Sequence, residues 1–127
     1  MRVLAAGETT GRAFTLAEFF GDGEGAWTVP HIHRGMEESF FVLEGAFTFS
    51  VGDRAIEATP GMYILIPRGT AHTIAAAKGG GRFLALMVPG GLEEMFFELG
   101  TLSTNAIRDP VARAAVSARY DSIPVSP

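Results

Sequence analysis

The sequence contains no cysteine among its 127 residues, so it can form no disulfide bond and offers no thiolate to a metal. Any metal site must therefore use histidine and carboxylate side chains, and histidine is itself scarce, with three in the chain. Long hydrophobic runs are also missing, since none approaches the roughly 20 apolar residues of a membrane-spanning helix. The apolar stretch at the start is too short for a signal peptide. These absences predict a cytoplasmic protein that does not enter a membrane.

Positive charge is in short supply as well. Ten Lys and Arg stand against 14 Asp and Glu, which gives a net charge of −4, and the basic residues do not cluster. Proteins that bind nucleic acid present a basic surface, so we do not expect nucleic acid as a partner. Hydrophobic residues make up 47% of the chain, which favours a packed globular protein over disorder. At this length we expect one domain over residues 1–127.

Short runs of β-forming residues fill the chain from about residue 12 to residue 88. Turn-forming residues separate these runs, for example at 44–45, 59–61 and 78–81. Many short strands at regular spacing are typical of a sandwich or a barrel rather than of βαβ units. The pattern therefore predicts an all-β body over residues 12–88.

The hydrophobic period changes after residue 91. One apolar stripe then has helical spacing, formed by Leu92, Met95, Phe96 and Leu99. Gly100 would end this helix. Residues 103–107 are interpreted as a linker, after which Asp109 and Pro110 open an Ala-rich run as N-cap and first helical residue. We therefore predict two short helices within about residues 91–120, followed by an irregular tail.

Two of the three histidines, His31 and His33, lie two residues apart. Side chains at this spacing share one face of a strand, and Glu38 follows after a short bend that could bring it back to them. Imidazole together with carboxylate suits Fe, Mn, Ni, Co or Zn. Two interpretations are open at this point: a metal site, or two surface histidines on an edge strand. The third histidine, His72, is in turn either a buried core residue or a further ligand.

The spacing of these residues resembles the two motifs of the cupin superfamily. The first motif occurs as Gly25, His31, His33, Glu38 and Gly45, and the second as Gly61, Pro67, Gly69 and His72. Ala76 stands where the second motif has Asn. Glu37 also fits the first half of its motif, but only Glu38 keeps the spacing to Gly45. The resemblance implies a jelly roll, a double-stranded antiparallel β-helix, with one divalent metal held in its mouth by His31, His33, Glu38 and His72.

The C-terminal run is similar to that of small bacterial cupins of the quercetinase-like group of dioxygenases. This resemblance implies a metal-dependent dioxygenase acting on an enol, diketone or phenolic molecule of polyketide or flavonoid type, with Glu38 also acting as a base. Two alternatives are a Zn-dependent cyclase or isomerase that needs no oxygen, and a binding protein without activity. The ligands do not decide among Fe, Mn, Ni, Co and Zn.

Apolar side chains near the expected metal site are candidates for the substrate pocket. They are Trp27, Met36, Phe40, Phe49, Tyr63, Ile74 and Phe83. The same side chains could instead serve only as barrel core. The C-terminal helical segment could cover the barrel mouth as a lid or contact a second subunit, and the resemblance implies a homodimer.

Overall fold

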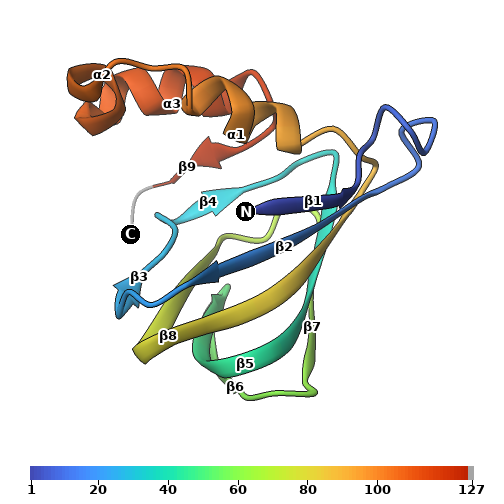
Figure 1. Cartoon of the computed structure of the whole chain (residues 1–127), viewed down its shortest axis with the longest axis vertical. Coiled ribbons are helices and arrows are strands. Elements are labelled where there is room, and N and C mark those ends of the chain that lie inside the picture. Colours follow the sequence, from blue (N-terminus) through green and yellow to red (C-terminus); the bar gives the residue numbers. More distant parts are fainter. Residues whose placement is uncertain (126–127) are drawn as a thin grey trace.

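The computed structural model describes residues 1–125, in which nine strands form one antiparallel sheet and three short helices follow the barrel (Figure 1). The strands are β1 (Arg2–Ala5), β2 (Thr15–Gly21), β3 (Gly25–Ala26), β4 (His31–Ile32), β5 (Glu37–Val51), β6 (Arg54–Ala58), β7 (Tyr63–Ile66), β8 (His72–Val88) and β9 (Ile123–Pro124). The helices are α1 (Glu93–Leu99), α2 (Thr104–Arg108) and α3 (Pro110–Ala118). The predicted jelly roll is therefore confirmed, although β1 lies before the expected start of the barrel.

The two longest strands run through points where the sequence predicts turns. β5 continues past residues 44–45, and β8 continues past residues 78–81. Gly45 has a φ of 78°, and a Cβ atom there would collide with the carbonyl oxygen of Gly80 on the paired strand. Glycine therefore serves here to bend two paired strands close together rather than to end them.

The inward faces of β5 and β8 form the core beneath the barrel mouth. Alternate residues of each strand point inward, as the period of a strand requires. The fully or nearly fully buried ones are Phe40, Val42, Phe47, Phe49, Phe83, Ala85 and Met87. The ring centroid of Phe83 lies 5.3 Å from that of Phe40 and 5.1 Å from that of Phe47. Ala76, the residue that replaces the motif Asn, is buried in this core with 5% exposure.

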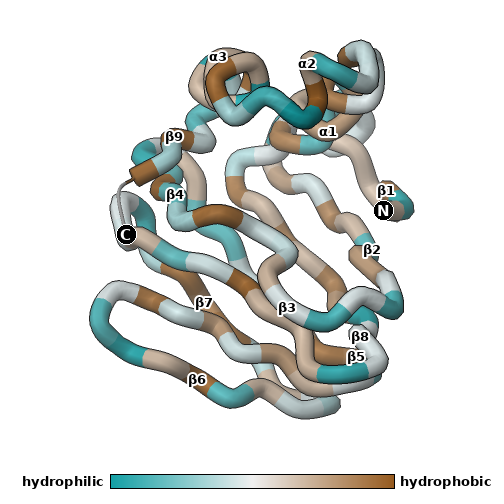
Figure 2. Tube along the Cα trace, turned by 90° about the vertical axis from the view of Figure 1, so that its left-hand side faces the viewer, coloured by the Kyte–Doolittle hydropathy of each residue, from teal (hydrophilic) through white to brown (hydrophobic). Residues whose placement is uncertain are grey.

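Three helices, rather than the two predicted, gather at one end of the barrel, above β4 and β9 (Figures 1 and 2). The interpretation of residues 103–107 as a linker is wrong, because the Ser103 hydroxyl accepts a hydrogen bond from the amide of Ala106 and caps α2. Ser, Thr and Asn favour both loops and helix caps, so the composition alone misled. Asp109 and Pro110 begin α3 as predicted.

The tail after α3 is not wholly irregular, as had been expected, because it forms β9. This two-residue strand pairs antiparallel with β4, placing Ile123 opposite Ile32. The C-terminal segment is thus brought beside the strand that carries the first histidine. Within residues 1–125, no helix is long and apolar enough to cross a membrane.

Candidate metal centre

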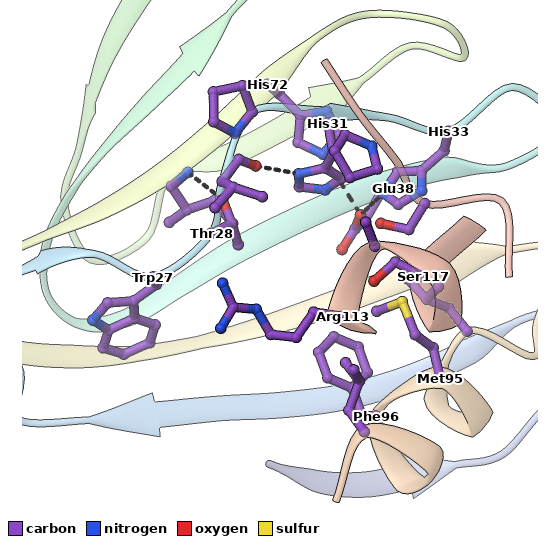
Figure 3. Close-up of a pocket in the computed structure, with 18 of the residues that line it drawn as sticks. Trp27, Thr28, His31, His33, Glu38, His72, Met95, Phe96, Arg113 and Ser117 are labelled. Carbon is purple, nitrogen blue, oxygen red and sulfur yellow. Dashed lines mark hydrogen bonds and ion pairs between the residues drawn. The ribbon is translucent and has the colours of Figure 1, made fainter. Parts of the chain in front are cut away.

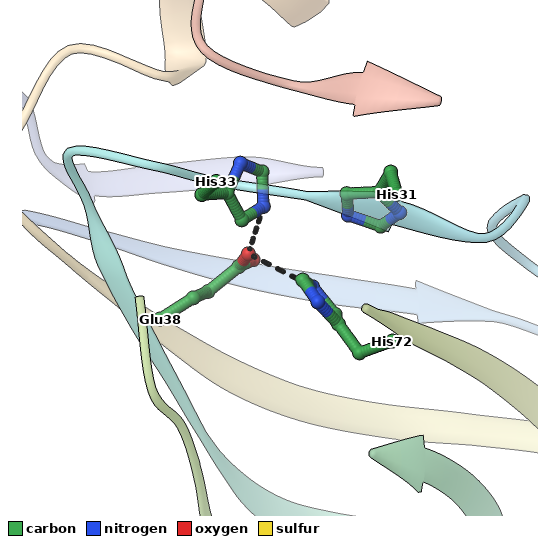
Figure 4. Close-up of side chains that lie close together, drawn as sticks. All are labelled: His31, His33, Glu38 and His72. Atoms are coloured by element: carbon green, nitrogen blue, oxygen red, sulfur yellow. Dashed lines mark ion pairs between the residues drawn. The ribbon is translucent and has the colours of Figure 1, made fainter. Parts of the chain in front are cut away.

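Four side chains, carried by three strands and the residue after one of them, converge at the barrel mouth (Figure 4). His31 lies on β4 and His33 just after it, Glu38 lies on β5, and His72 begins β8. One potential ligand atom from each side chain lies within 4.8 Å of the others. His31 and His72 are direct partners in the antiparallel pairing of β4 with β8, so the sheet register itself brings them together.

A turn between β7 and β8 joins the two halves of this cluster. Gly69, with a φ of 75°, donates its amide hydrogen to the carbonyl oxygen of His33 at 2.7 Å. Pro67 precedes it, and its carbonyl accepts from the amide of Thr70. The predicted Pro-x-Gly turn therefore ties the residue that carries one ligand to the start of the strand that carries His72.

Each histidine ring is oriented through its Nδ1 atom by a backbone carbonyl. The Nδ1 atoms of His31, His33 and His72 lie 2.7, 2.8 and 3.0 Å from the carbonyl oxygens of Val29, Asp121 and Thr70. Since a carbonyl can only accept, each Nδ1 carries the hydrogen, and the lone pair of the neutral ring lies on Nε2. All three rings are thus held in the tautomer that binds a metal through Nε2.

The buried atoms of this cluster match the needs of a cation. Glu38, His33 and His72 are 7%, 3% and 2% exposed, and the Nε2 atoms of His33 and His72 are buried without a hydrogen-bond partner. The Nε2 of His33 lies 2.9 Å from Oε2 of Glu38, and that of His72 lies 3.8 Å from the same oxygen. Neutral Nε2 and carboxylate oxygen are both acceptors, so their convergence calls for a positive charge between them. The four residues could therefore hold one metal ion.

Electrostatics within the cluster favour the ligand forms of Glu38 and His31. Burial alone would raise the pKa of Glu38, but its close contacts with the imidazoles of His33 and His72, which attract the carboxylate when protonated, outweigh burial and lower the pKa to about 2. Burial and the neighbouring His72 lower the pKa of His31 to about 4. Burial opposes protonation of His33, yet the Glu38 carboxylate raises its pKa. At neutral pH an anionic Glu38 and a neutral His31 are thus ready to bind a metal, whereas at His33 a metal would compete with a proton that Glu38 attracts.

The cluster lies in the wall of a cavity of about 880 Å³ between the barrel and the helices (Figure 3). Of the predicted pocket residues, four line this cavity: Trp27, Phe40, Ile74 and Phe83. Phe49 is fully buried behind Phe40 in the core, and Met36 borders a separate small cavity. Tyr63 is 61% exposed on the outer face of β7 and does not belong to the pocket, contrary to expectation. Its neighbours Ile64 and Ile66 face inward, since adjacent residues of a strand alternate.

Other cavity residues come from the C-terminal segment, for which the sequence left open a lid over the barrel mouth or a contact with a second subunit. The whole stripe predicted for the first helix faces the cavity, namely Leu92, Met95, Phe96 and Leu99. Arg113 and Ser117 of α3 join it, so the helices cover the barrel mouth (Figure 3). The helical period identified the stripe, but no signal in the sequence showed which surface it would cover.

Asp121 is a second residue that the sequence did not bring to the site. Its carbonyl accepts from Nδ1 of His33, and its carboxylate accepts from the amides of Arg34 and Gly35 at 2.9 and 2.7 Å. The residue has a φ of 59°, a conformation that Asp tolerates better than most residues. Asp121 therefore holds both the ring of His33 and the loop that follows it.

Comparison with known proteins shows which family this chain resembles in sequence. A family model described as the cupin domain matches residues 20–89. The chain is 30% identical over 115 residues to quercetin 2,3-dioxygenase of Aspergillus japonicus, a match that covers 86% of this chain and 33% of that protein. It is 29% identical over 99 residues to quercetin 2,3-dioxygenase of Bacillus subtilis (strain 168), covering 78% of this chain and 29% of that protein. The chain thus spans about a third of the length of these curated relatives.

Solved structures agree on the fold. The structure of KdgF from Halomonas sp. superposes with a TM-score of 0.64 at 19% identity, over 73% of this chain and 80% of that one. At this identity the likeness extends to the fold alone. Since the cupin model matches more than half of the chain and the structure has the same architecture, this protein belongs to the cupin family.

Proposed function

We propose that this chain is a metal-dependent dioxygenase that acts on an enol, diketone or phenolic small molecule. The observation that carries the proposal is the convergence of three imidazoles and one carboxylate in the wall of a largely apolar cavity. The distant similarity to two quercetin 2,3-dioxygenases supports the same type of reaction.

The four ligands would bind a divalent ion and leave one or two coordination positions for other groups. Structural metal sites use all positions for protein ligands, whereas catalytic sites keep some open. When bound, the metal would polarise substrate oxygen atoms and, if it is a transition metal, allow chemistry with dioxygen. The chain's own contribution is to fix the three rings through Val29, Asp121 and Thr70 before any ion arrives.

The cavity walls would orient the substrate and exclude water. A volume of about 880 Å³ falls in the range of roughly 300–1,000 Å³ that is typical of small-molecule sites. Trp27 and Phe83 lie with ring centroids 5.8 Å apart, and Phe40 lies 5.3 Å from Phe83. Flat apolar surfaces of this kind suit an aromatic or conjugated substrate, whose oxygen atoms would face the His and Glu side chains.

Glu38 would bind the metal and also interact with a hydroxyl group of the substrate. Because its pKa is lowered to about 2, it stays ionised and can accept a hydrogen bond from a substrate hydroxyl. A carboxylate with so low a pKa is a weak base, so it takes a proton only from an unusually acidic hydroxyl. Enols, 1,3-diketones and phenols are more acidic than simple alcohols, and a bound metal that polarises their oxygen would make them more acidic still. We therefore favour these classes over simple alcohols.

The direct test combines metal analysis with oxygen uptake. The natively expressed protein is analysed for bound metals and then screened in an oxygen electrode against a flavonol and a 1,3-diketone. We expect one transition metal per chain and substrate-dependent oxygen consumption, both lost in His72→Ala. Turnover of such a substrate without oxygen by a Zn-containing protein would instead support a cyclase or isomerase. Metal-independent, reversible binding without turnover would support a binding protein.

A further inference from the structure

One cationic side chain stands out among the described residues that line the cavity. Arg113 extends from α3 into this space, and Figure 3 shows its guanidinium directed toward Trp27 and away from Glu38. The side chain is partly buried. Its Nη1 donates a hydrogen bond of 2.7 Å to the carbonyl of Ile107, and none of the ion pairs within residues 1–125 involves it.

The other two arginines of the helical segment are placed differently. Arg119 is mostly exposed and paired with Glu98, and Arg108 is exposed on α2. A guanidinium has five N–H donors, and the structure gives Arg113 one acceptor. Because the side chain is only partly buried, its remaining donors are available to an anionic group that enters the cavity.

The charges around the cavity favour an anion. Glu38 is the one carboxylate among the described residues that line it, and this group belongs to the metal centre. With a divalent ion bound, three neutral imidazoles and one carboxylate would carry a charge of about +1, to which Arg113 adds its own. Aromatic surface, including Trp27 and Phe96, lies in the same cavity as both charged centres.

We propose that the natural ligand is an aromatic or conjugated acid whose carboxylate is held by Arg113. The planar fork of a guanidinium matches a carboxylate through two parallel hydrogen bonds. The enol or phenol oxygen of the same molecule would then face the His and Glu cluster. This orientation of the second end rests on the proposed function, whereas the carboxylate end rests on Arg113 and the cavity alone.

A matched pair of probes tests the carboxylate end. The probes are 6-hydroxy-2-naphthoate and 2-naphthol, which share the fused ring and the hydroxyl and differ by the carboxylate. Isothermal titration calorimetry at pH 7.5 measures both dissociation constants. We expect the acid to bind at least about tenfold more tightly, the size of one charge-assisted hydrogen bond. Trp27 is the one tryptophan in the chain, so quenching of its emission reports whether the probe enters this cavity.

Two variants assign the preference to Arg113. Arg113→Gln removes the charge but keeps a donor for the Ile107 carbonyl, and we expect the two probes to bind it equally well. Arg113→Lys should keep part of the preference. Arg108→Gln removes one positive charge from the same helical segment outside the cavity, and it should leave the preference unchanged. Thermal melts establish that each variant is folded.

Several results would overturn this inference. They are equal binding of the two probes by the wild type, no binding of the acid at millimolar concentration, or an unchanged preference in Arg113→Gln. The last result would place the carboxylate at the metal cluster instead. Repeating the titrations after metal removal by a chelator separates this inference from the proposed function. The preference for the acid should survive this treatment. If the natively expressed protein shows the preference but binds no metal and consumes no oxygen, the proposed function alone is refuted.

Discussion

A buried carboxylate on α1 provides the sharpest test of how the helices are held over the cavity. Glu93 is 3% exposed, and its two oxygens accept hydrogen bonds from the amide of Gly7 at 2.8 Å and from the hydroxyl of Thr15 at 2.7 Å. The Thr15 oxygen in turn accepts from the amide of Gly91 at 3.0 Å. These bonds fix the start of α1 to the barrel, so we expect Glu93→Gln to loosen the whole cover.

The expected magnitude follows from the donors. Gln has one carbonyl oxygen where Glu has two carboxylate oxygens, so either Gly7 or Thr15 loses its acceptor. A hydrogen bond to a charged group contributes about 1.5–3 kcal/mol. We therefore expect Glu93→Gln to lower the free energy of unfolding by about 2 kcal/mol. For a chain of this length such a loss corresponds to a fall in melting temperature of roughly 8 °C.

The neighbouring residue supplies the control. Glu94 is about half exposed and lies 3.9 Å from Arg12, a surface pair that contributes little. Urea unfolding followed by circular dichroism should show a loss for Glu94→Gln of less than about 0.5 kcal/mol. If the two variants lose the same stability, the hydrogen bonds of Glu93 do not hold α1, and the reasoning is refuted.

The pH dependence of the same comparison has a definite sign. Burial would raise the pKa of Glu93, but the bonds from Thr15 and Gly7 outweigh it and lower the pKa below its ordinary value of 4.5. A carboxyl group with a lowered pKa stabilises the fold above its unfolded pKa and loses that contribution as pH falls through the folded value. The difference between wild type and Glu93→Gln should thus be constant from pH 6 to 8 and shrink below about pH 4.5.

Three further outcomes are expected. Glu38→Gln should weaken metal binding by more than the 10–100-fold that is typical of outer-sphere changes, whereas Glu37, whose side chain is 48% exposed, serves as the control, and Glu37→Gln should leave metal affinity unchanged. Competition with a chromophoric chelator measures both affinities, and equal losses would contradict the assignment of Glu38 as a ligand. Asp121→Ala should weaken the same binding about tenfold, since its carboxylate holds the loop after β4; unchanged affinity would count against this role. The homodimer stays a prediction, and the exposed apolar side chains Tyr63 and Leu65 on the outer face of the sheet, 61% and 50% exposed, are a surface for it. Analytical ultracentrifugation should give the mass of a dimer for the wild type and a lower mass for Tyr63→Lys. A monomeric wild type would contradict the predicted homodimer.

The fold could be predicted from the sequence because short strands and turn residues repeat along it. The cluster of His31, His33, Glu38 and His72 could be predicted because these residues keep the spacing of two motifs, and a spacing of two on a strand sets a common face. The predictions that were wrong concern residue types that occur in two kinds of local structure. Glycine is common in turns, but Gly45 bends a strand that continues past it. Serine is common in loops, but Ser103 caps the start of a helix.

Contacts made by the tail lay beyond prediction for a different reason. Asp121 touches His33 across 88 positions of the sequence, and no local pattern encodes a partner so distant. Arg113 falls on a helix whose Ala-rich sequence does not reveal which way its face turns. Their positions depend on how α1 and α3 pack over the barrel, and this is decided by tertiary structure rather than by periodicity.

The bond between His33 and the Asp121 carbonyl has a consequence for the order in which the protein matures. Translation proceeds from the amino end, so all four residues of the cluster emerge before the residue that fixes the His33 ring. A barrel that meets a metal ion at that stage offers three oriented side chains and one free to rotate. Pairing of β9 with β4 would then place the Asp121 carbonyl against the ring and fix its orientation. The arrangement of the four residues that could hold a metal ion is thus complete only after a segment far along the chain has docked.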